Sequence, residues 1–333
     1  MPLTKQAQVV ATLVFAIALP WQKAAGQSSQ SSIAESSAQL HAVPVTSASA
    51  SPATPMAADP ELSPVAPSLQ LLLDFKDSDI KFQIESLMGI LRDSKHEGWV
   101  LAAYPDPKTS RPLIGAGFGL DVPATDHPQL DPLNPRPFVE PSSAQLWQAA
   151  GLDSQLMQTI LARFDRDLNA WKKKKYRRKI RAHTLRPEIT NEEATKLLRI
   201  STIQAVQNAK AYCRDFDQLS ASQQMALSQL VFQMGTNLGE FVQFLGAIND
   251  GASQSGPAAE AENDHWKTVQ RTLIESQWAH LYRIRATTVI AMFDPDYLDD
   301  PYAAEQRVAA ELPPPPKHHH KKARSSQSKR KLA

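Results

Sequence analysis

Four apolar residues between positions 84 and 91 recur at the spacing of an α-helix. They lie three or four positions apart and so share one face of an α-helix, and either Asp77 or Ser78 can cap its start. Gly98 is the expected end of this helix. The apolar positions are Ile84, Leu87, Met88 and Leu91.

A short β-hairpin is predicted directly after this helix. Residues 100–104 (Val-Leu-Ala-Ala-Tyr) predict a strand, and the prolines on either side of Asp106 hold that residue in a turn. The chain can return through Ile114 as a second strand, where Gly115 and Gly117 allow backbone or ligand to approach closely.

The rest of the chain is predicted to be largely helical. Apolar positions indicate helices over 142–180 and 190–212, whereas the Pro- and Asp-rich residues 121–141 predict an irregular loop. Another apolar helix is expected around 227–235. The expected fold class is therefore α+β, with a small lobe that contains the hairpin and a larger α-helical lobe.

The two ends of the chain differ in composition from its middle. Residues 1–26 have the outline of a secretory signal peptide, because Lys5 precedes an apolar run too short to span a bilayer and small residues follow. Residues 27–70, rich in Ser, Ala and Pro, predict a disordered linker, and 309–333 predict a Pro-rich, basic disordered tail. We expect an exported protein, secreted or periplasmic, with its folded domain at 71–308.

Positive charge is concentrated locally. The formal net charge is only +2, but basic residues crowd 172–181 and the C-terminal tail. Nucleic-acid binding is one interpretation of 172–181, yet an exported protein rarely meets nucleic acid, so none is expected. A solvated helix end explains the segment equally well, and adhesion to anionic envelope polymers or lipid is the functional alternative.

Neither the possible metal-ligating residues nor the single cysteine indicates a bound cofactor. The spacing of the acidic and histidine residues in the irregular loop matches no known ligand set, and the tail histidines are simply explained as solvated. Cys213 is the single cysteine; it excludes an intramolecular disulfide and is expected to be a small core residue. The loop residues are Asp126, His127, Asp131 and Glu140.

Two carboxylates flank the predicted hairpin. Glu97 lies at the expected helix end, where the dipole tends to raise a carboxyl pKa, and Asp106 lies in the hairpin turn. Glycoside cleavage needs such a pair, because one protonated acid assists the leaving oxygen while an ionised partner acts on water or the sugar cation. A solvated acidic turn has the same spacing, so the pair alone does not decide the function.

The sequence around these carboxylates resembles the phage-type lysozymes, glycoside hydrolase family 24. Their motif is a Glu at a helix end, a Tyr seven positions on, an Asp nine positions on, and then Ile-Gly-x-Gly, which here are Glu97, Tyr104, Asp106 and 114–117.

A second stretch is similar to the same family. Residues 230–235 (Leu-Val-Phe-Gln-Met-Gly) nearly repeat its central helix, and Trp266, Trp278 and Arg285 follow in the family's order. The resemblance covers roughly residues 80–120 and 188–300 and treats 121–187 as an insertion.

The resemblance implies an N-acetylmuramidase, which cleaves the β-1,4 bond between N-acetylmuramic acid and N-acetylglucosamine in peptidoglycan. Glu97 corresponds to the general acid, and Asp106 to the carboxylate that positions and activates water, with inversion. Arg285 corresponds to the arginine that pairs with the catalytic Glu. Contacts with substrate are implied for Tyr104, Phe232 and Gln233. Peptidoglycan is then the partner of an expected monomer that needs no metal or cofactor.

The sequence departs from the family where the attacking water would be held. Leu113 replaces the Thr that helps to hold this water, and the turn between Asp106 and Ile114 is one residue longer. The longer turn brings Thr109 and Ser110 into the region, and either hydroxyl is a candidate for the missing hydrogen bond.

The sequence departs from the family at other positions as well, and two alternatives to the hydrolase stay open, the first of them because the Thr is missing. Phe118 replaces a family His, and Phe244 and Thr272 stand where the family has sugar-contacting Ser and Asn. One alternative is a lytic transglycosylase, in which Glu97 suffices and the muramic acid's own hydroxyl replaces water. The other is a non-catalytic module that binds the cell wall.

Deletion of the residues after Pro313 tests the adhesion hypothesis. Cosedimentation with purified peptidoglycan sacculi should weaken at low salt and hardly change at high salt, where counterions screen the attraction. Turnover of short soluble oligosaccharides should stay the same. A large loss of that turnover would mean instead that the tail shapes the site.

Overall fold

The computed structural model describes residues 67–94, 96–170, 175, 178–179, 185–250 and 258–314. The predicted signal peptide, nearly all of the predicted linker, most of the basic segment 172–181 and the histidine-containing tail lie outside these residues. Within the described residues, no helix is both long and apolar enough to cross a membrane.

Helix α2 (Ile84–Arg92) is shorter than predicted at both ends. Residues 77–79 form a separate 3-10 turn, and the backbone N–H of Lys81 donates to Oε1 of Gln224, 2.8 Å away, which keeps the chain extended before α2. At the other end the helix stops five residues before Glu97, and the N–H of Gly98 donates to the carbonyl of Asp93 in a closing turn. The prediction that Glu97 ends the helix is therefore wrong.

The predicted hairpin is confirmed and extended by a third strand. Strands β1 (Val100–Pro105), β2 (Pro112–Gly115) and β3 (Phe118–Gly119) form an antiparallel sheet in the order β1-β2-β3. Tyr104 pairs with Leu113, and Val100 with Gly115, with an irregularity between the two pairs. The short β3 follows a tight glycine-containing turn and was not predicted.

Among the described residues, the helix predicted over 142–180 is interrupted near residue 151. Helix α3 (Ser143–Ala149) ends before Gly151, whose φ of 73° is incompatible with a continuous right-handed helix, and α4 (Ser154–Ala170) follows. The indole N–H of Trp147 donates to the carbonyl of Asp153 at 2.8 Å, which fixes the connection.

The predicted helices over 190–212 and around 227–235 are confirmed. Thr190 caps the first, because its hydroxyl accepts the N–H of Glu193 at 3.1 Å. The described connections between later helices include the 3-10 segments Phe216–Gln218 and Gly235–Glu240. The helices after the sheet region are α6 (Asn191–Tyr212), α7 (Ala221–Met234), α8 (Val242–Asn249), α9 (Ala258–Ile274), α10 (Gln277–Leu281), α11 (Arg283–Ala291) and α12 (Pro301–Glu311).

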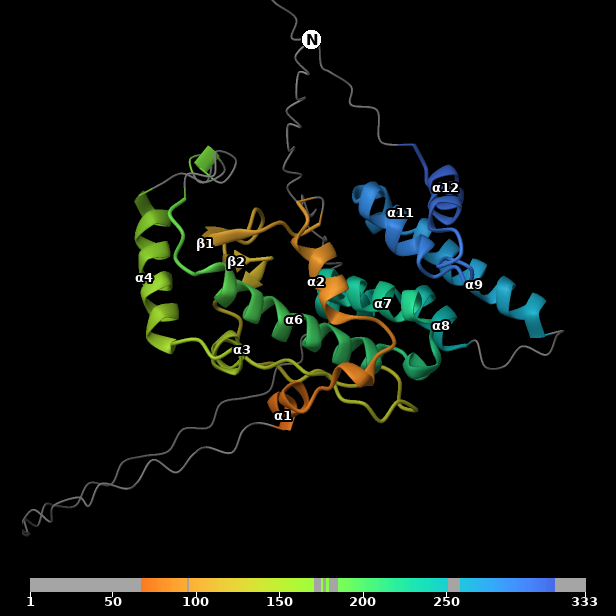
Figure 1. Ribbon diagram of the computed structural model, residues 1–333, viewed down its shortest axis with the longest axis horizontal. Helices are drawn as coiled ribbons and strands as arrows, with labels where there is room; N and C mark the ends of the chain where they lie inside the picture. The colour runs from red at the N-terminus through yellow and green to blue at the C-terminus, as the bar shows by residue number, and fades with distance from the viewer. Residues whose placement is uncertain are drawn as a thin grey trace, which may run out of the picture.

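Helix α6 runs through the middle of the molecule and joins two hydrophobic cores (Figure 1). Its N-terminal turns, with Leu197, pack with the sheet, α3 and α4, whereas Leu198 and later residues pack with α2 and α7. Helices α9, α11 and α12 lie together on the other side of the molecule from α4 (Figure 1). Trp266 and Trp278 are 7% and 4% exposed, as expected for buried helices. This arrangement is an α+β fold.

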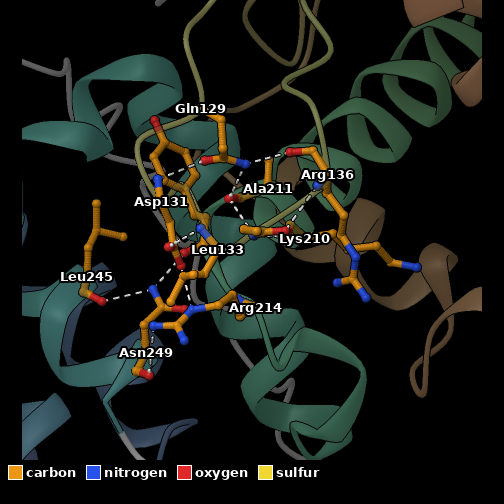
Figure 2. Close-up of polar contacts among 11 residues, drawn as sticks. Gln129, Asp131, Leu133, Arg136, Lys210, Ala211, Arg214, Leu245 and Asn249 are labelled. Atoms are coloured by element: carbon orange, nitrogen blue, oxygen red, sulfur yellow. Dashed lines mark hydrogen bonds and ion pairs between the residues drawn. The ribbon is translucent and has the colours of Figure 1, made fainter.

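The loop predicted over 121–141 is irregular, and it docks on the C-terminal end of α6 (Figure 2). Amide groups of Gln129 and Asn134 donate to the carbonyl of Ala211 at 3.1 and 2.8 Å, which satisfies a helix-end acceptor. Asp131 pairs with Arg214 at 2.5 Å. The described residues contain no cluster of three or more metal-ligating side chains.

Two further observations concern the core and the limits of the domain. Cys213 is fully buried, and burial raises the pKa of its thiol to about 12, so it is the core residue that the sequence predicted. Helix α1 (Pro67–Leu73) begins slightly before residue 71, and α12 ends slightly after residue 308. The helices thus reach just beyond both predicted domain limits.

Candidate active site

A groove with a volume of about 880 Å³ lies between the sheet and the helices α7, α10 and α11. It brings together residues from the beginning, middle and end of the domain. All six site residues predicted from the sequence line it: Glu97, Tyr104, Asp106, Phe232, Gln233 and Arg285.

Glu97 enters the groove from the turn that follows α2. Its backbone N–H donates to the carbonyl of Leu91, and Gly98 continues the turn with a φ of 79°. Gly117, between β2 and β3, approaches from the other side: a side chain there would begin 3.7 Å from Oε2 of Glu97 and would need a φ of 84°. Both glycines are therefore required by the backbone that surrounds this carboxyl group.

An ion pair holds Glu97 against α11. Nη1 of Arg285 lies 2.9 Å from Oε1 of Glu97, and the two side chains are only 11% and 24% exposed. Burial raises the pKa of Glu97, and the Arg285 guanidinium partly opposes that rise by favouring the carboxylate. Burial, and not a position in the last helical turn, is thus the main cause of the raised pKa.

Asp106 is held by its own turn. Its Oδ1 accepts the N–H groups of Lys108 and Thr109, each at 2.7 Å, and the hydroxyl of Thr109 at 3.0 Å. Three donors on one oxygen fix the orientation of the carboxyl group. The other oxygen, Oδ2, accepts no hydrogen bond from the described residues, which leaves it available for a ligand in the groove.

Thr109 and Ser110 differ in what they do for Asp106. The Thr109 hydroxyl bonds to the carboxylate itself, and neither residue is part of the groove wall. Ser110 contributes a backbone N–H to the carbonyl of Asp106 and has a φ of 65°. The longer turn therefore supports the Asp106 carboxylate. Leu113 lines the groove at the position where the phage-type motif has Thr.

Tyr104 lies close to both carboxylates. Burial raises the pKa of its phenol, and the negative charges of Glu97 and Asp106 raise it further. The phenol therefore stays protonated and can donate a hydrogen bond. Because Tyr104 and Leu113 are paired across the strands, their side chains lie on the same face of the sheet.

Gln233 lines the groove, but its amide group lies beneath the surface of the wall. Its Nε2 and Oε1 are both buried and have no hydrogen-bond partner among the described residues. A buried polar group without a partner costs on the order of 1–3 kcal/mol, which favours a shift of the Gln233 side chain toward a partner. Phe232 precedes it on α7 and adds an apolar surface to the wall.

The sequence did not indicate that Tyr282 and Trp99 line the groove. Tyr282 lines the groove, its ring centre lies 5.7 Å from the Arg285 guanidinium, and burial raises its pKa. Trp99 also lines the groove, with the guanidinium of Arg92 4.2 Å from its ring centre and its indole N–H on Asn191 at 2.9 Å. Tyr282 lies at the junction between α10 and α11, so its place beside Arg285 follows from no helical spacing in the sequence.

The other departures from the family lie away from the carboxylates. Phe244 is 1% exposed in the core, and the Thr272 hydroxyl donates to the carbonyl of Val269 in its own helix. Phe118 packs against Trp147, with ring centres 6.5 Å apart. None of these three therefore adds a polar group to the part of the groove that holds the two carboxylates.

No protein-family model, curated protein or solved structure matches this chain. The interpretation of the groove depends on its residues and their chemistry.

Replacement of Arg285 by Met should lower the free energy of unfolding by about 1–3 kcal/mol at neutral pH, because a partly buried carboxylate loses its partner. The loss should shrink as the pH falls through the raised pKa of Glu97, since protonation removes the charge that Arg285 stabilises. Urea unfolding at several pH values measures both effects.

Arg307→Met is a matched control, because it breaks the more exposed pair with Asp294 and should cost less than about 1 kcal/mol. Equal costs for the two variants, or a cost at Arg285 that does not depend on pH, would contradict a stabilising pair with Glu97.

Proposed function

We propose that this protein is an exported peptidoglycan hydrolase, an N-acetylmuramidase of the phage-type lysozyme family. The observation that carries the proposal is one groove with two differently placed carboxyl groups. Glu97 is partly buried and has a raised pKa, whereas Asp106 is held by three hydrogen-bond donors. Such a division between a protonated acid and an ionised base is what glycoside hydrolysis requires.

In the proposed reaction Glu97 donates its proton to the oxygen that links N-acetylmuramic acid to N-acetylglucosamine. The bond from that oxygen to the anomeric carbon breaks, and a water molecule attacks the carbon from the opposite face. Asp106 accepts the water's proton, so the configuration is inverted. Arg285 then stabilises the carboxylate that Glu97 has become, because their atoms are only 2.9 Å apart.

The remaining groove residues bind and orient the sugar. The buried, unpaired amide of Gln233 would donate to and accept from sugar hydroxyl or acetamido groups when its side chain turns into the groove. Phe232 offers an apolar surface to the less polar face of a sugar ring. The phenol of Tyr104, kept protonated by its surroundings, is a donor between the two carboxylates. The scheme uses no metal or cofactor.

Leu113 favours one alternative, a lytic transglycosylase. It puts an apolar side chain in the groove where a hydroxyl would hold water, and a transglycosylase uses the muramic acid hydroxyl in place of water. Digestion of purified sacculi with mass spectrometry of the products separates the two reactions. Reducing muramic acid ends support hydrolysis, whereas 1,6-anhydro ends support transglycosylation. Binding to sacculi without release of fragments would instead support the non-catalytic wall-binding module.

Glu97→Gln tests the general acid. The amide keeps the size of the side chain but has no proton to give the leaving oxygen, so release of soluble fragments from sacculi should stop. Circular dichroism and cosedimentation with sacculi should show that fold and binding are retained. A Gln variant with most of the original activity would exclude Glu97 from the mechanism.

Asp106→Ala should lower kcat by about 10²–10⁴-fold, the usual contribution of a positioned general base. Thr109→Val removes one of the three donors on Oδ1 and should give a smaller loss, on the order of 10-fold. Ser110→Gly suits the positive φ and should leave kcat unchanged. Near-normal turnover of Asp106→Ala with anhydro-muramic products would replace hydrolysis by transglycosylation.

A further inference from the structure

A second, smaller pocket of about 220 Å³ lies behind the glycine-rich turn that faces Glu97. One wall is formed by residues 115–119, and the opposite wall by α6. Ala116, Gly117 and Phe232 line both this pocket and the catalytic groove, so the two cavities are neighbours across the thin turn. Part of the second pocket comes from the loop over 121–141, which the family resemblance does not cover.

The pocket contains a carboxylate without a cationic partner. Glu140 accepts the amide N–H groups of Asn208 at 2.8 Å and of Gln204 at 3.2 Å. Neither Lys nor Arg is among the described residues that line the pocket, and Glu140 forms no ion pair with the described residues. Burial raises the pKa of Glu140, because no positive charge compensates its desolvation.

The side-chain donors around Glu140 already donate hydrogen bonds to other groups of the protein. Nδ2 of Asn208 and Nε2 of Gln204 both also donate to the carbonyl of Val139, at 3.1 and 2.9 Å. The Ser201 hydroxyl donates to the carbonyl of Leu197 at 2.8 Å. The side-chain atoms left for a ligand among these lining residues are therefore acceptors: the Glu140 carboxylate, Oε1 of Gln204 and the lone pairs of the Ser201 oxygen.

Because these free side-chain atoms are hydrogen-bond acceptors, the pocket favours a ligand that carries several N–H donors and a positive charge. A metal ion fits poorly, because a single carboxylate stands among neutral oxygens and the described residues hold no metal-ligand cluster. An –NH₃⁺ group has three donors and one charge, which suits one carboxylate and two neutral acceptors. We propose that this pocket binds a primary ammonium group, with Glu140 as its counter-ion.

The position of the pocket indicates where the ammonium group comes from. The proposed function has glycan bound in the groove. A peptide stem on a muramic acid there would reach Glu140 if it extended past the turn at Gly117. Stems with a free diamino-acid side chain end in a primary ammonium. The pocket then makes the enzyme prefer glycan that carries such stems over bare glycan.

Binding can be measured without catalysis. Calorimetry of the full chain with a soluble stem tripeptide that ends in a diamino acid should show binding, and acetylation of the side-chain amine should abolish it. Glu140→Gln should weaken binding at least tenfold, whereas Glu275→Gln, which removes a surface charge elsewhere, should not change it. No binding to the wild type, or equal binding of the acetylated peptide, would overturn the proposal. Tighter binding of 1,5-diaminopentane than of the tripeptide would overturn the stem as the source.

A second variant and a second assay keep the test independent of folding and of the proposed reaction. Ser201→Met fills the pocket from α6 without touching Glu140 and should weaken tripeptide binding to the same extent. With intact glycan, both variants should raise KM about tenfold and leave kcat unchanged; with glycan stripped of its stems, neither should have an effect. Equal effects on both substrates would contradict the proposal. Absence of turnover by the wild type on either substrate would refute the proposed hydrolase, while calorimetry would still decide the pocket.

Discussion

The groove depends on the ion pair between Glu97 and Arg285, which joins segments 188 residues apart in the chain. Burial favours the neutral acid, and the guanidinium favours the carboxylate. An acid catalyst needs both forms, because it must hold a proton before the bond breaks and tolerate the charge afterwards. Burial alone would retain the proton too strongly, and the arginine alone would remove it too early. The opposition of the two effects at one carboxyl group is therefore the physical basis of the proposed reaction.

The backbone around this pair leaves little freedom. Gly98 and Gly117 have positive φ angles, and Gly117 faces Glu97 so closely that a side chain there would enter the site. Asp106 is fixed independently by donors from its own turn. The acid is thus positioned by tertiary packing and the base by a local turn. A change that loosens the packing between the lobes would move Glu97 relative to an Asp106 that keeps its own geometry.

The sequence predicted the features that depend on residues close together in the chain. The hairpin, the Thr190 cap and the helices over 190–212 and 221–234 follow from alternation, capping and apolar periodicity, and the motif placed all six predicted residues in one groove. The limits of α2 could not be predicted, because the contact between Lys81 and Gln224 joins residues 143 positions apart. The approach of Tyr282 to the carboxylates and the acceptor pocket at Glu140 likewise arise from packing between distant segments, and neither leaves a spacing signal in the sequence.

The strand register gives a physical reason for the departure at Leu113. Because Leu113 lies opposite Tyr104, a hydroxyl on the same face of the sheet already stands beside both carboxylates. An apolar neighbour lowers the local polarity and keeps that phenol protonated, so the phenol can donate to a water whose other partner is the free oxygen of Asp106. A threonine at position 113 would compete for the same water. Leu113, where phage-type lysozymes have Thr, is therefore compatible with the proposed hydrolysis when the water is held from the tyrosine side of the hairpin.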